Sequence, residues 1–412
     1  MKISITETVF WVCFCAVAYT YLAYPVLLFV LASAAQVMRD VSYLIGRRDR
    51  RQSCQEEFLP RAAVLVSAHN EESVIEAKIQ NTRELDYPSD HLEFLLGLDA
   101  PSDLTPERAS RTHSPSVQIF NFALRRGKLL VLQDLAQRTS ADILVLSDAN
   151  TMLKRDCLRK LIRHFVDPSV GAVSGEEVRV AANGTKAPMA SLYWRYEAAL
   201  KILESRLNCA LGANGAVYAI RRHLFRLKKN WIVEDFQIPM DVRFGGHRVI
   251  YDPEARAIED VAPTLAAEFQ RKVRIGAGDY QTLLGNPRFL NPLKGLPAFA
   301  YWSHKVLRWL APLFLIGALA SNLLLVLRPF YAGVFMAQCA FYLLATLGYG
   351  LQRHGKLTRL TSVPLYFSLM NLALLLGMFR FLSGRQEVVW SATPRRVPSG
   401  PVVESVGREG HD

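Results

Sequence analysis

The sequence of 412 residues is poor in cysteine and in charge and has no internal repeat. Its six cysteines are scattered, with no CxxC pair and no histidine at zinc-finger spacing, which excludes a disulfide framework and a structural zinc site. Charged residues make up 21% of the chain and hydrophobic residues 50%, which excludes a disordered chain. A mean hydropathy of +0.12 indicates that part of the chain lies in lipid.

Basic residues exceed acidic ones by 49 to 37, which gives a net charge of +12. Many of them gather beside hydrophobic runs, at 39–51 and 353–359, as is typical of the cytoplasmic face of a membrane. No interleaving of aromatic and basic residues and no nucleic-acid motif accompanies the charge. The charge pattern therefore predicts membrane lipids as partners, and no nucleic acid.

Charge is absent altogether between residues 8 and 38, and this stretch is long and apolar. It is too long for the core of a signal peptide and has no clear cleavage site, so we predict an uncleaved transmembrane anchor at 1–38. Three more apolar runs predict C-terminal transmembrane helices within 310–383. The segment 291–309 before them mixes tryptophan with basic residues, which is typical of an amphipathic helix in the headgroup layer.

The distribution of charge also predicts how the chain is oriented. The basic linker at 39–60 places the domain that follows it on the cytoplasmic side of the plasma (inner) membrane. Three C-terminal crossings would then put the tail at 384–412 outside, although this tail carries Arg385, Arg395 and Arg396. The side on which the tail lies is therefore left open.

Residues 61–290 have the composition of a globular domain. Near-continuous hydrophobic runs at 62–68, 94–99, 117–122 and 141–148 alternate with helical stretches. Such runs are typical of parallel strands that are buried on both faces of a sheet. We therefore predict a Rossmann-like, doubly wound α/β domain between the membrane segments.

Polar and acidic residues follow three of these predicted strands, at 69–72, 99–103 and 148–151. Ligands of open α/β sheets bind beyond the carboxyl ends of the strands, so we expect the three segments to meet in one crevice. The same residue types also suit turns and helix N-caps. What favours a ligand is Lys128, which follows Gly127 at the start of a predicted helix, where a lysine beside backbone N–H groups suits a phosphate.

Seven motifs occur in order between about residues 64 and 278: VSAHNEE, LDAPSDLT, RRGK, SDANT, GANGAVYAIRR, VEDF and EFQRKVRIGAG. This ordered set resembles the membrane-bound glycosyltransferases of family 2, which have the GT-A fold. The resemblance implies an inverting enzyme of the hexosyltransferase type. Such an enzyme moves a sugar from a UDP-sugar donor to a glycan or lipid-linked acceptor, in exopolysaccharide or cell-envelope glycan synthesis.

The resemblance also implies which residues bind the donor. Ala68 and Glu71 would border the uridine and ribose, and Asp99 would hydrogen-bond the uracil base. Asp103 and Lys128 would complete the nucleotide site.

A divalent metal, Mg²⁺ or Mn²⁺, is implied as the cofactor, because a hard cation with oxygen ligands neutralises the leaving diphosphate. Asp148 would bind both this metal and the donor. Asn150 stands where the family usually has a second aspartate, and its amide oxygen can coordinate the metal but brings no charge.

The adjacent pair Glu234 and Asp235 resembles the catalytic acids of the family. Asp235 would be the general base that deprotonates the acceptor hydroxyl, and one displacement of this kind inverts the configuration. The alternative is that the pair only begins a helix.

Five residues are candidates for acceptor binding. Gly212 and Gly215 would let the backbone approach the acceptor. Gln270, Arg271 and Arg274 lie where processive relatives carry Gln-x-x-Arg-Trp, but the tryptophan is missing here. These basic residues would hold the diphosphate or lipid headgroups, or form a solvated helix face.

Two alternatives remain beside an enzyme that adds one or a few sugars. One is a processive polysaccharide synthase that couples polymerisation to export, against which the missing tryptophan counts. The other is a catalytically inactive membrane protein that binds nucleotide-sugar, against which the presence of Asp99, Lys128, Asp148 and Asp235 counts.

Overall fold

The computed structural model describes residues 4–46, 58–112, 117–180, 190–227, 231–260 and 264–385. The chain divides into two compact units. Of the described residues, those within 4–37 and 265–385 form a helical unit, and those within 38–264 form an α/β unit. Most of the predicted tail at 384–412 and the middle of the predicted linker at 39–60 lie outside the described residues.

Eight strands within the described residues form one sheet in the α/β unit, in the order β3-β2-β1-β4-β7-β6-β8-β5. The strands are β1 (Ala62–Ala68), β2 (Leu92–Asp99), β3 (Val117–Phe122), β4 (Ile143–Ser147), β5 (Met152–Leu153), β6 (Val170–Val180), β7 (Val217–Arg221) and β8 (Arg248–Asp260).

The sheet is mixed rather than wholly parallel. The four strands predicted from the sequence, β1 to β4, are parallel neighbours. Helices α3 (Ile75–Arg83), α4 (Thr105–Arg111) and α5 (Lys128–Gln137) connect them, as parallel strands require. β7 runs antiparallel to both β4 and β6, and β5 runs antiparallel to β8, whereas β6 and β8 pair in parallel.

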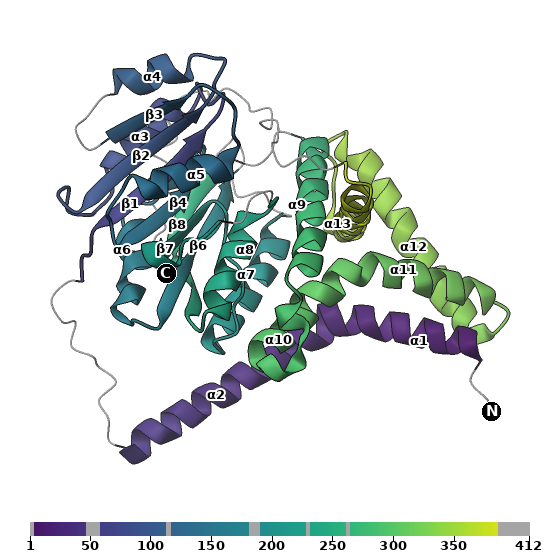
Figure 1. Cartoon of the computed structure of the whole chain (residues 1–412). Helices are drawn as coiled ribbons and strands as arrows, with labels where there is room; N and C mark the ends of the chain where they lie inside the picture. The colour runs from purple at the N-terminus through teal and green to yellow at the C-terminus, as the bar shows by residue number, and fades with distance from the viewer. Residues whose placement is uncertain are drawn as a thin grey trace, which may run out of the picture. The chain divides into compact units, whose positions relative to one another are not determined.

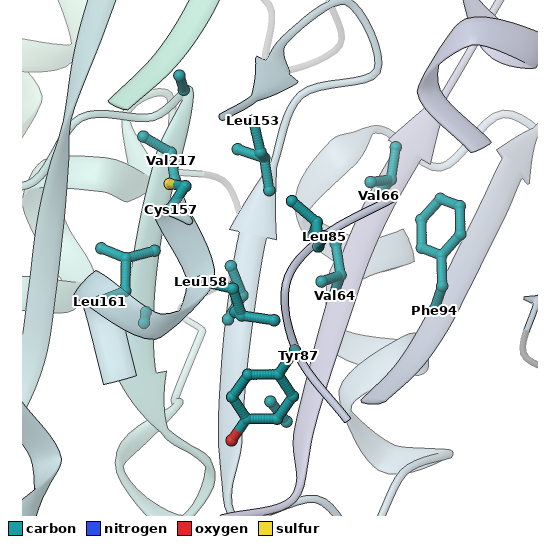
Figure 2. Close-up of a cluster of buried hydrophobic side chains, with 14 of the residues drawn as sticks. Val64, Val66, Leu85, Tyr87, Phe94, Leu153, Cys157, Leu158, Leu161 and Val217 are labelled. Atoms are coloured by element: carbon teal, nitrogen blue, oxygen red, sulfur yellow. The ribbon is translucent and has the colours of Figure 1, made fainter. Parts of the chain in front are cut away.

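Both faces of the sheet are buried. Val64 and Val66 of β1 belong to a hydrophobic cluster with residues of α3, α4 and α6 (Cys157–Ile162), part of which Figure 2 shows. Ala63 and Leu65 of the same strand belong to a second cluster, with residues of α5 and α8 (Glu234–Phe244). Successive side chains of a strand point to opposite faces, which explains why the strand is a continuous apolar run. The helical cover on both faces confirms the prediction of a doubly wound domain.

Among the described residues, seven α-helices lie wholly or partly in the helical unit. These are α1 (Ile5–Ala18), α2 (Tyr24–Gly46, which runs on into the α/β unit), α9 (Leu265–Gly285), α10 (Leu296–Ala300), α11 (Leu307–Leu324), α12 (Pro329–Gln352) and α13 (Arg359–Leu382). Four helical segments of the described chain are long and apolar enough to cross a membrane: Ile5–Gly46, Leu296–Leu324, Pro329–Gln352 and Arg359–Leu382. One N-terminal and three C-terminal segments agree with the prediction. Part of the predicted interfacial helix at 291–309 continues without a break into α11.

Helix α9 belongs to the helical unit, whereas the prediction of a domain at 61–290 placed it with the sheet. The reason is a close contact between α9 and α13, which lie side by side in Figure 1. A Cβ atom built on Gly377 of α13 would lie 2.7 Å from the backbone nitrogen of Ala277 and 2.8 Å from the carbonyl oxygen of Val273. Glycine therefore lets the two backbones touch, as small residues do between membrane helices.

The substitution Gly377→Ala should destabilise the protein, although alanine normally favours a helix over glycine. The added methyl group meets backbone atoms of α9 that cannot move aside, and overpacking of this kind costs about 1–3 kcal/mol. We expect a melting temperature several degrees below that of the wild type in detergent. Gly333→Ala in α12 is the matched control, because a Cβ atom there meets nothing within 4 Å. Equal melting temperatures for the two variants would contradict this account.

Candidate active site

Lys128 lies among carboxylates at the carboxyl ends of the central strands. It is the first residue of α5 and follows Gly127, whose φ of +84° favours glycine. The Lys128 Nζ atom lies 2.7 Å from Oδ1 of Asp148 and 2.5 Å from Oε1 of Glu234. Asp148 follows β4 and Glu234 begins α8, so two carboxylates that are distant in sequence share one ammonium group.

The electrostatics of this cluster favour a cation. Burial lowers the pKa of Lys128, but the charges of Asp148 and Glu234 raise it by more, so the pKa lies well above its usual range. The amine therefore stays protonated at physiological pH. It also lies at the N-terminus of a helix, where backbone N–H groups favour anions such as phosphate.

Asp235 lies next to this cluster and is held by the loop that precedes β7. Its Oδ2 atom accepts a hydrogen bond from the Gly215 N–H at 3.0 Å, and its carbonyl accepts one from the Ala213 N–H at 2.8 Å. Burial raises the pKa of Asp235 to about 6; the charge of Glu234 adds to this shift, and Lys128 opposes it. A carboxylate that gains its proton close to neutral pH suits a general base.

The two predicted acceptor glycines lie against Asp235 and its neighbour Phe236. A Cβ atom on Gly215 would lie 2.9 Å from Oδ2 of Asp235, and one on Gly212 would lie 2.7 Å from the ring of Phe236. The glycines therefore leave room for the start of α8. Their contact with an acceptor stays a prediction.

Asp99 fixes the loop that leads to Lys128. Its two carboxylate oxygens accept hydrogen bonds from the backbone N–H groups of Arg126 and Gly127, at 2.7 and 2.8 Å. Its carbonyl oxygen is hydrogen-bonded to Nδ1 of His69 at 2.7 Å, which ties the loop after β1 to the loop after β2. Asp99 thus has a structural role, and its contact with a uracil base stays a prediction.

Three other predicted donor residues lie in the same two loops. Ala68 is buried at the end of β1, and the Glu71 N–H donates to Oγ1 of Thr105 at 2.8 Å. Asp103 accepts from the Thr105 N–H at 3.0 Å and so caps the turn that opens α4. The structure therefore brings Ala68, Glu71 and Asp103 to one edge of the sheet, and their contact with a donor stays a prediction.

The side chain of Asn150 points toward β8, because its amide nitrogen donates a hydrogen bond to Oε1 of Glu259 at 2.9 Å. Its amide oxygen is thus the atom that could coordinate a metal. Among the described residues no group of three or more histidine, cysteine or acidic side chains is arranged to hold a metal ion. Asp148 and Asn150 nevertheless fit Mg²⁺ or Mn²⁺ that is bound largely by a substrate, because Mg²⁺ commonly takes one or two carboxylates plus phosphate oxygens.

The remaining acceptor candidates lie on α9, in the helical unit. Oε1 of Gln270 accepts from Arg380 of α13 at 3.0 Å, and Arg271 forms an ion pair with Glu268 at 2.9 Å. Arg274 lies further along the same helix. Gln270 thus links α9 to α13, whereas Arg271 pairs within its own helix, and a role of the three residues in acceptor binding stays a prediction.

Lys78 of α3 is a site residue that the sequence analysis missed. It is fully buried, and its amine donates to Oγ of Ser147 at 2.8 Å and to the carbonyl of Thr151 at 2.6 Å. These two bonds hold both ends of the turn that carries Asp148 and Asn150. The available signal was a lysine on the apolar face of a helix, between Ile75 and Ile79.

The comparisons with known families agree with this geometry. Residues 143–352 match the family described as glycosyl transferase family group 2, and residues 26–229 match glycosyl transferase family 21. The chain is 28% identical over 238 residues to a beta-monoglucosyldiacylglycerol synthase of Trichormus variabilis, covering 55% of this chain and 50% of the relative. The corresponding protein of Synechocystis is 30% identical over 141 residues, which cover 32% of this chain and 29% of the relative.

A poly-beta-1,6-N-acetyl-D-glucosamine synthase of Staphylococcus aureus is 24% identical over 259 residues, which are 60% of each chain. The match thus spans about a third to three fifths of the length of these curated relatives. Among solved structures, a mannosyltransferase from Pyrobaculum calidifontis in complex with GDP-Man and Mn²⁺ superposes with a TM-score of 0.67 at 20% identity. The superposition covers 92% of this chain and 99% of that one, and it confirms the prediction of a GT-A fold with long apolar helices.

The buried amine of Lys78 should make stability depend on pH. Burial lowers the pKa of Lys78 to about 7 from 10.5, although Asp148 opposes this shift. At a pH between these two pKa values, Lys78 carries a proton in the unfolded chain but not in the folded chain. The free energy of unfolding should therefore rise with pH, by up to about 1.4 kcal/mol per pH unit. Below pH 7 the amine is charged in both states and adds no slope.

Lys78→Met keeps the length of the side chain and removes the titrating group. Melting temperatures are measured in steps from pH 7 to pH 10. The melting temperature of the wild type should rise relative to that of the variant as the pH increases. Parallel curves would show that the amine does not titrate in this range.

Proposed function

The chain belongs to glycosyl transferase family group 2, and we propose that it moves a sugar from a UDP-sugar to an acceptor held at the membrane, with inversion at the anomeric carbon. The observation that carries this proposal is the cluster in which Asp148 and Glu234 share the ammonium group of Lys128 beside Asp235. This cluster combines a cation that can bind a diphosphate, Lys128, with a carboxylate that can accept a proton, Asp235.

Lys128 binds the diphosphate of the donor in this proposal. Its ammonium group is already desolvated and lies at the N-terminus of α5, where the first N–H groups of the helix also face an anion. On donor binding, phosphate oxygens replace a carboxylate oxygen in its hydrogen bonds. Asp99 keeps the preceding loop in place during this exchange, because it holds the N–H groups of Arg126 and Gly127.

Asp235 is the general base. It takes the proton of the acceptor hydroxyl while the acceptor oxygen bonds to the anomeric carbon from the face opposite the diphosphate. The bond between that carbon and the phosphate oxygen breaks, and the diphosphate leaves with the electron pair. Gly215 keeps the base in position through its N–H, and a single displacement inverts the configuration.

Asp148 and the amide oxygen of Asn150 would hold Mg²⁺ or Mn²⁺ against the diphosphate. When bound, this ion would neutralise charge that builds up on the leaving group. The Mn²⁺ in the solved mannosyltransferase supports this part of the proposal. Lys78 positions the turn that carries both ligands.

The acceptor that we favour is a lipid alcohol of the diacylglycerol type. Synthases of monoglucosyldiacylglycerol are among the relatives, and four helices of the described chain are apolar enough to keep the enzyme at its acceptor. The basic residues at 39–51 favour a plasma (inner) membrane location with a cytoplasmic catalytic unit. The second candidate is synthesis of a polysaccharide, which the match to a poly-N-acetylglucosamine synthase supports.

A donor screen tests this function. Membranes that contain the protein should release UDP from one of UDP-glucose, UDP-galactose, UDP-N-acetylglucosamine and UDP-glucuronate, and vesicles with diacylglycerol should yield a glycolipid by mass spectrometry. A polymer ladder would instead favour the polysaccharide synthase.

Asp235→Asn should lower transfer at least about a hundredfold with UDP binding retained, because only the base is lost. Asp90→Asn is the control, since the Asp90 side chain is 79% exposed. Full transfer by Asp235→Asn would remove the base assignment.

The rate should depend on pH through Asp235. The base must be deprotonated, so kcat/KM should rise as the pH increases through about 6, the pKa to which burial and Glu234 raise this carboxyl group. Glu234→Gln removes the neighbouring negative charge and should move this acid limb to lower pH by about one unit. Glu254→Gln, at a side chain that is 58% exposed, should leave the limb unchanged. An acid limb at the same pH in Glu234→Gln would contradict the coupling.

A further inference from the structure

The hydroxyl group of Tyr218 is buried without a partner. Tyr218 lies on β7, opposite Leu146 of β4 and Ser174 of β6. The side chain is fully buried, and its oxygen has no hydrogen-bond partner among the residues that the structure describes. Buried tyrosine hydroxyls are normally hydrogen-bonded, and an unpaired one costs free energy.

A phenylalanine would fill the same space without this cost. The Tyr218 ring packs in the hydrophobic cluster formed with residues of α5 and α8, including Leu132, Ile238 and Val242. None of these side chains requires a hydroxyl group beside it. An unpaired buried polar group in a native structure calls for an explanation, and a role in the chemistry of a nearby site is one kind.

The charged residues around the phenol belong to the active site. Burial raises the pKa of Tyr218 well above its usual range, and among the neighbouring charges Glu234 contributes most, followed by Lys128, which opposes the shift, and then by Asp235 and Asp148. The hydroxyl therefore stays protonated and can only act as a donor toward a carboxylate. Helices α5 and α8, which cover the ring, begin with Lys128 and Glu234 themselves.

Glu234 is the carboxylate that would gain from a new hydrogen-bond donor while the sugar donor is bound. Only 9% of the residue is exposed, and its Oε1 atom lies 2.5 Å from the ammonium group of Lys128. When Lys128 turns to a diphosphate, Glu234 loses this ion pair. The loss of one ion pair weakens the stabilisation of a buried carboxylate, and a new hydrogen bond offsets part of that loss.

We propose that Tyr218 is a positioning residue, whose hydroxyl group donates a hydrogen bond to Glu234 when Lys128 leaves that carboxylate to bind the donor diphosphate. This inference rests on the proposed function, because it requires a diphosphate at Lys128. The hydroxyl then destabilises the free enzyme and stabilises the donor complex. The exchange forms and breaks hydrogen bonds only, and no covalent bond changes.

Tyr218→Phe should therefore change the two states in opposite directions. We expect the full-length variant in detergent to melt at the same temperature as the wild type or higher when no ligand is present. Its affinity for UDP in the presence of Mn²⁺ should fall about tenfold, as is typical for the loss of one hydrogen bond to a charged group. Isothermal titration calorimetry gives the affinity, and a thermal melt gives the stability.

Tyr87→Phe is the matched control. The Tyr87 hydroxyl is also in the α/β unit, but it donates to the carbonyl of Pro60 at 2.5 Å. This variant should melt at a lower temperature, because it leaves that carbonyl without its donor, and it should bind UDP as tightly as the wild type.

Two results would overturn the inference with the proposed function intact. One is wild-type UDP affinity in Tyr218→Phe, and the other is a loss of stability without ligand as large as that of Tyr87→Phe. If the wild type itself does not bind UDP with Mn²⁺, the proposed donor is wrong, and the inference falls with it.

Discussion

One ammonium group organises the catalytic end of this molecule. Without Lys128, the carboxylates of Asp148 and Glu234 would repel each other in a partly buried site. The repulsion would be strong, because charges interact more strongly where the effective dielectric constant is low. The lysine lets β4 and α8 approach, and the approach of α8 brings Asp235 to the same place. The protein thus holds a cation where, in the proposed function, the diphosphate of the donor would bind.

The surroundings of this ion pair are built to keep it in position. Asp99 holds the loop in front of Lys128 through two backbone N–H groups, and Lys78 holds both ends of the turn that follows β4. These two residues work from different sides of the sheet, since α3 and α5 belong to opposite hydrophobic clusters. Each has an ionisable side chain that is buried. Hydrogen bonds to that side chain offset the free energy that its burial costs.

The helical unit follows a different rule of packing. Helix α13 is long and apolar, so a hydrophobic face alone does not select one neighbour for it over another. Glycine does so at the contact of α9 and α13, where Gly377 lets the backbones touch. This contact explains why α9 follows the helical unit rather than the sheet that precedes it in the chain.

The sequence alone determined the local elements and the positions where polar residues follow a strand. Near-continuous apolar runs identified β1 to β4, and the residues after them identified Asp99, Lys128 and Asp148. The acidic pair and the apolar helices were also readable, because each depends on residues adjacent in the chain. Only the tertiary structure decided that β7 is antiparallel, that Asn150 turns to Glu259, that Lys78 bonds to Ser147, and that the Tyr218 hydroxyl is buried without a partner among the described residues. A buried lysine or tyrosine has no local pattern of its own, because its role depends on partners that the fold alone brings within hydrogen-bonding distance.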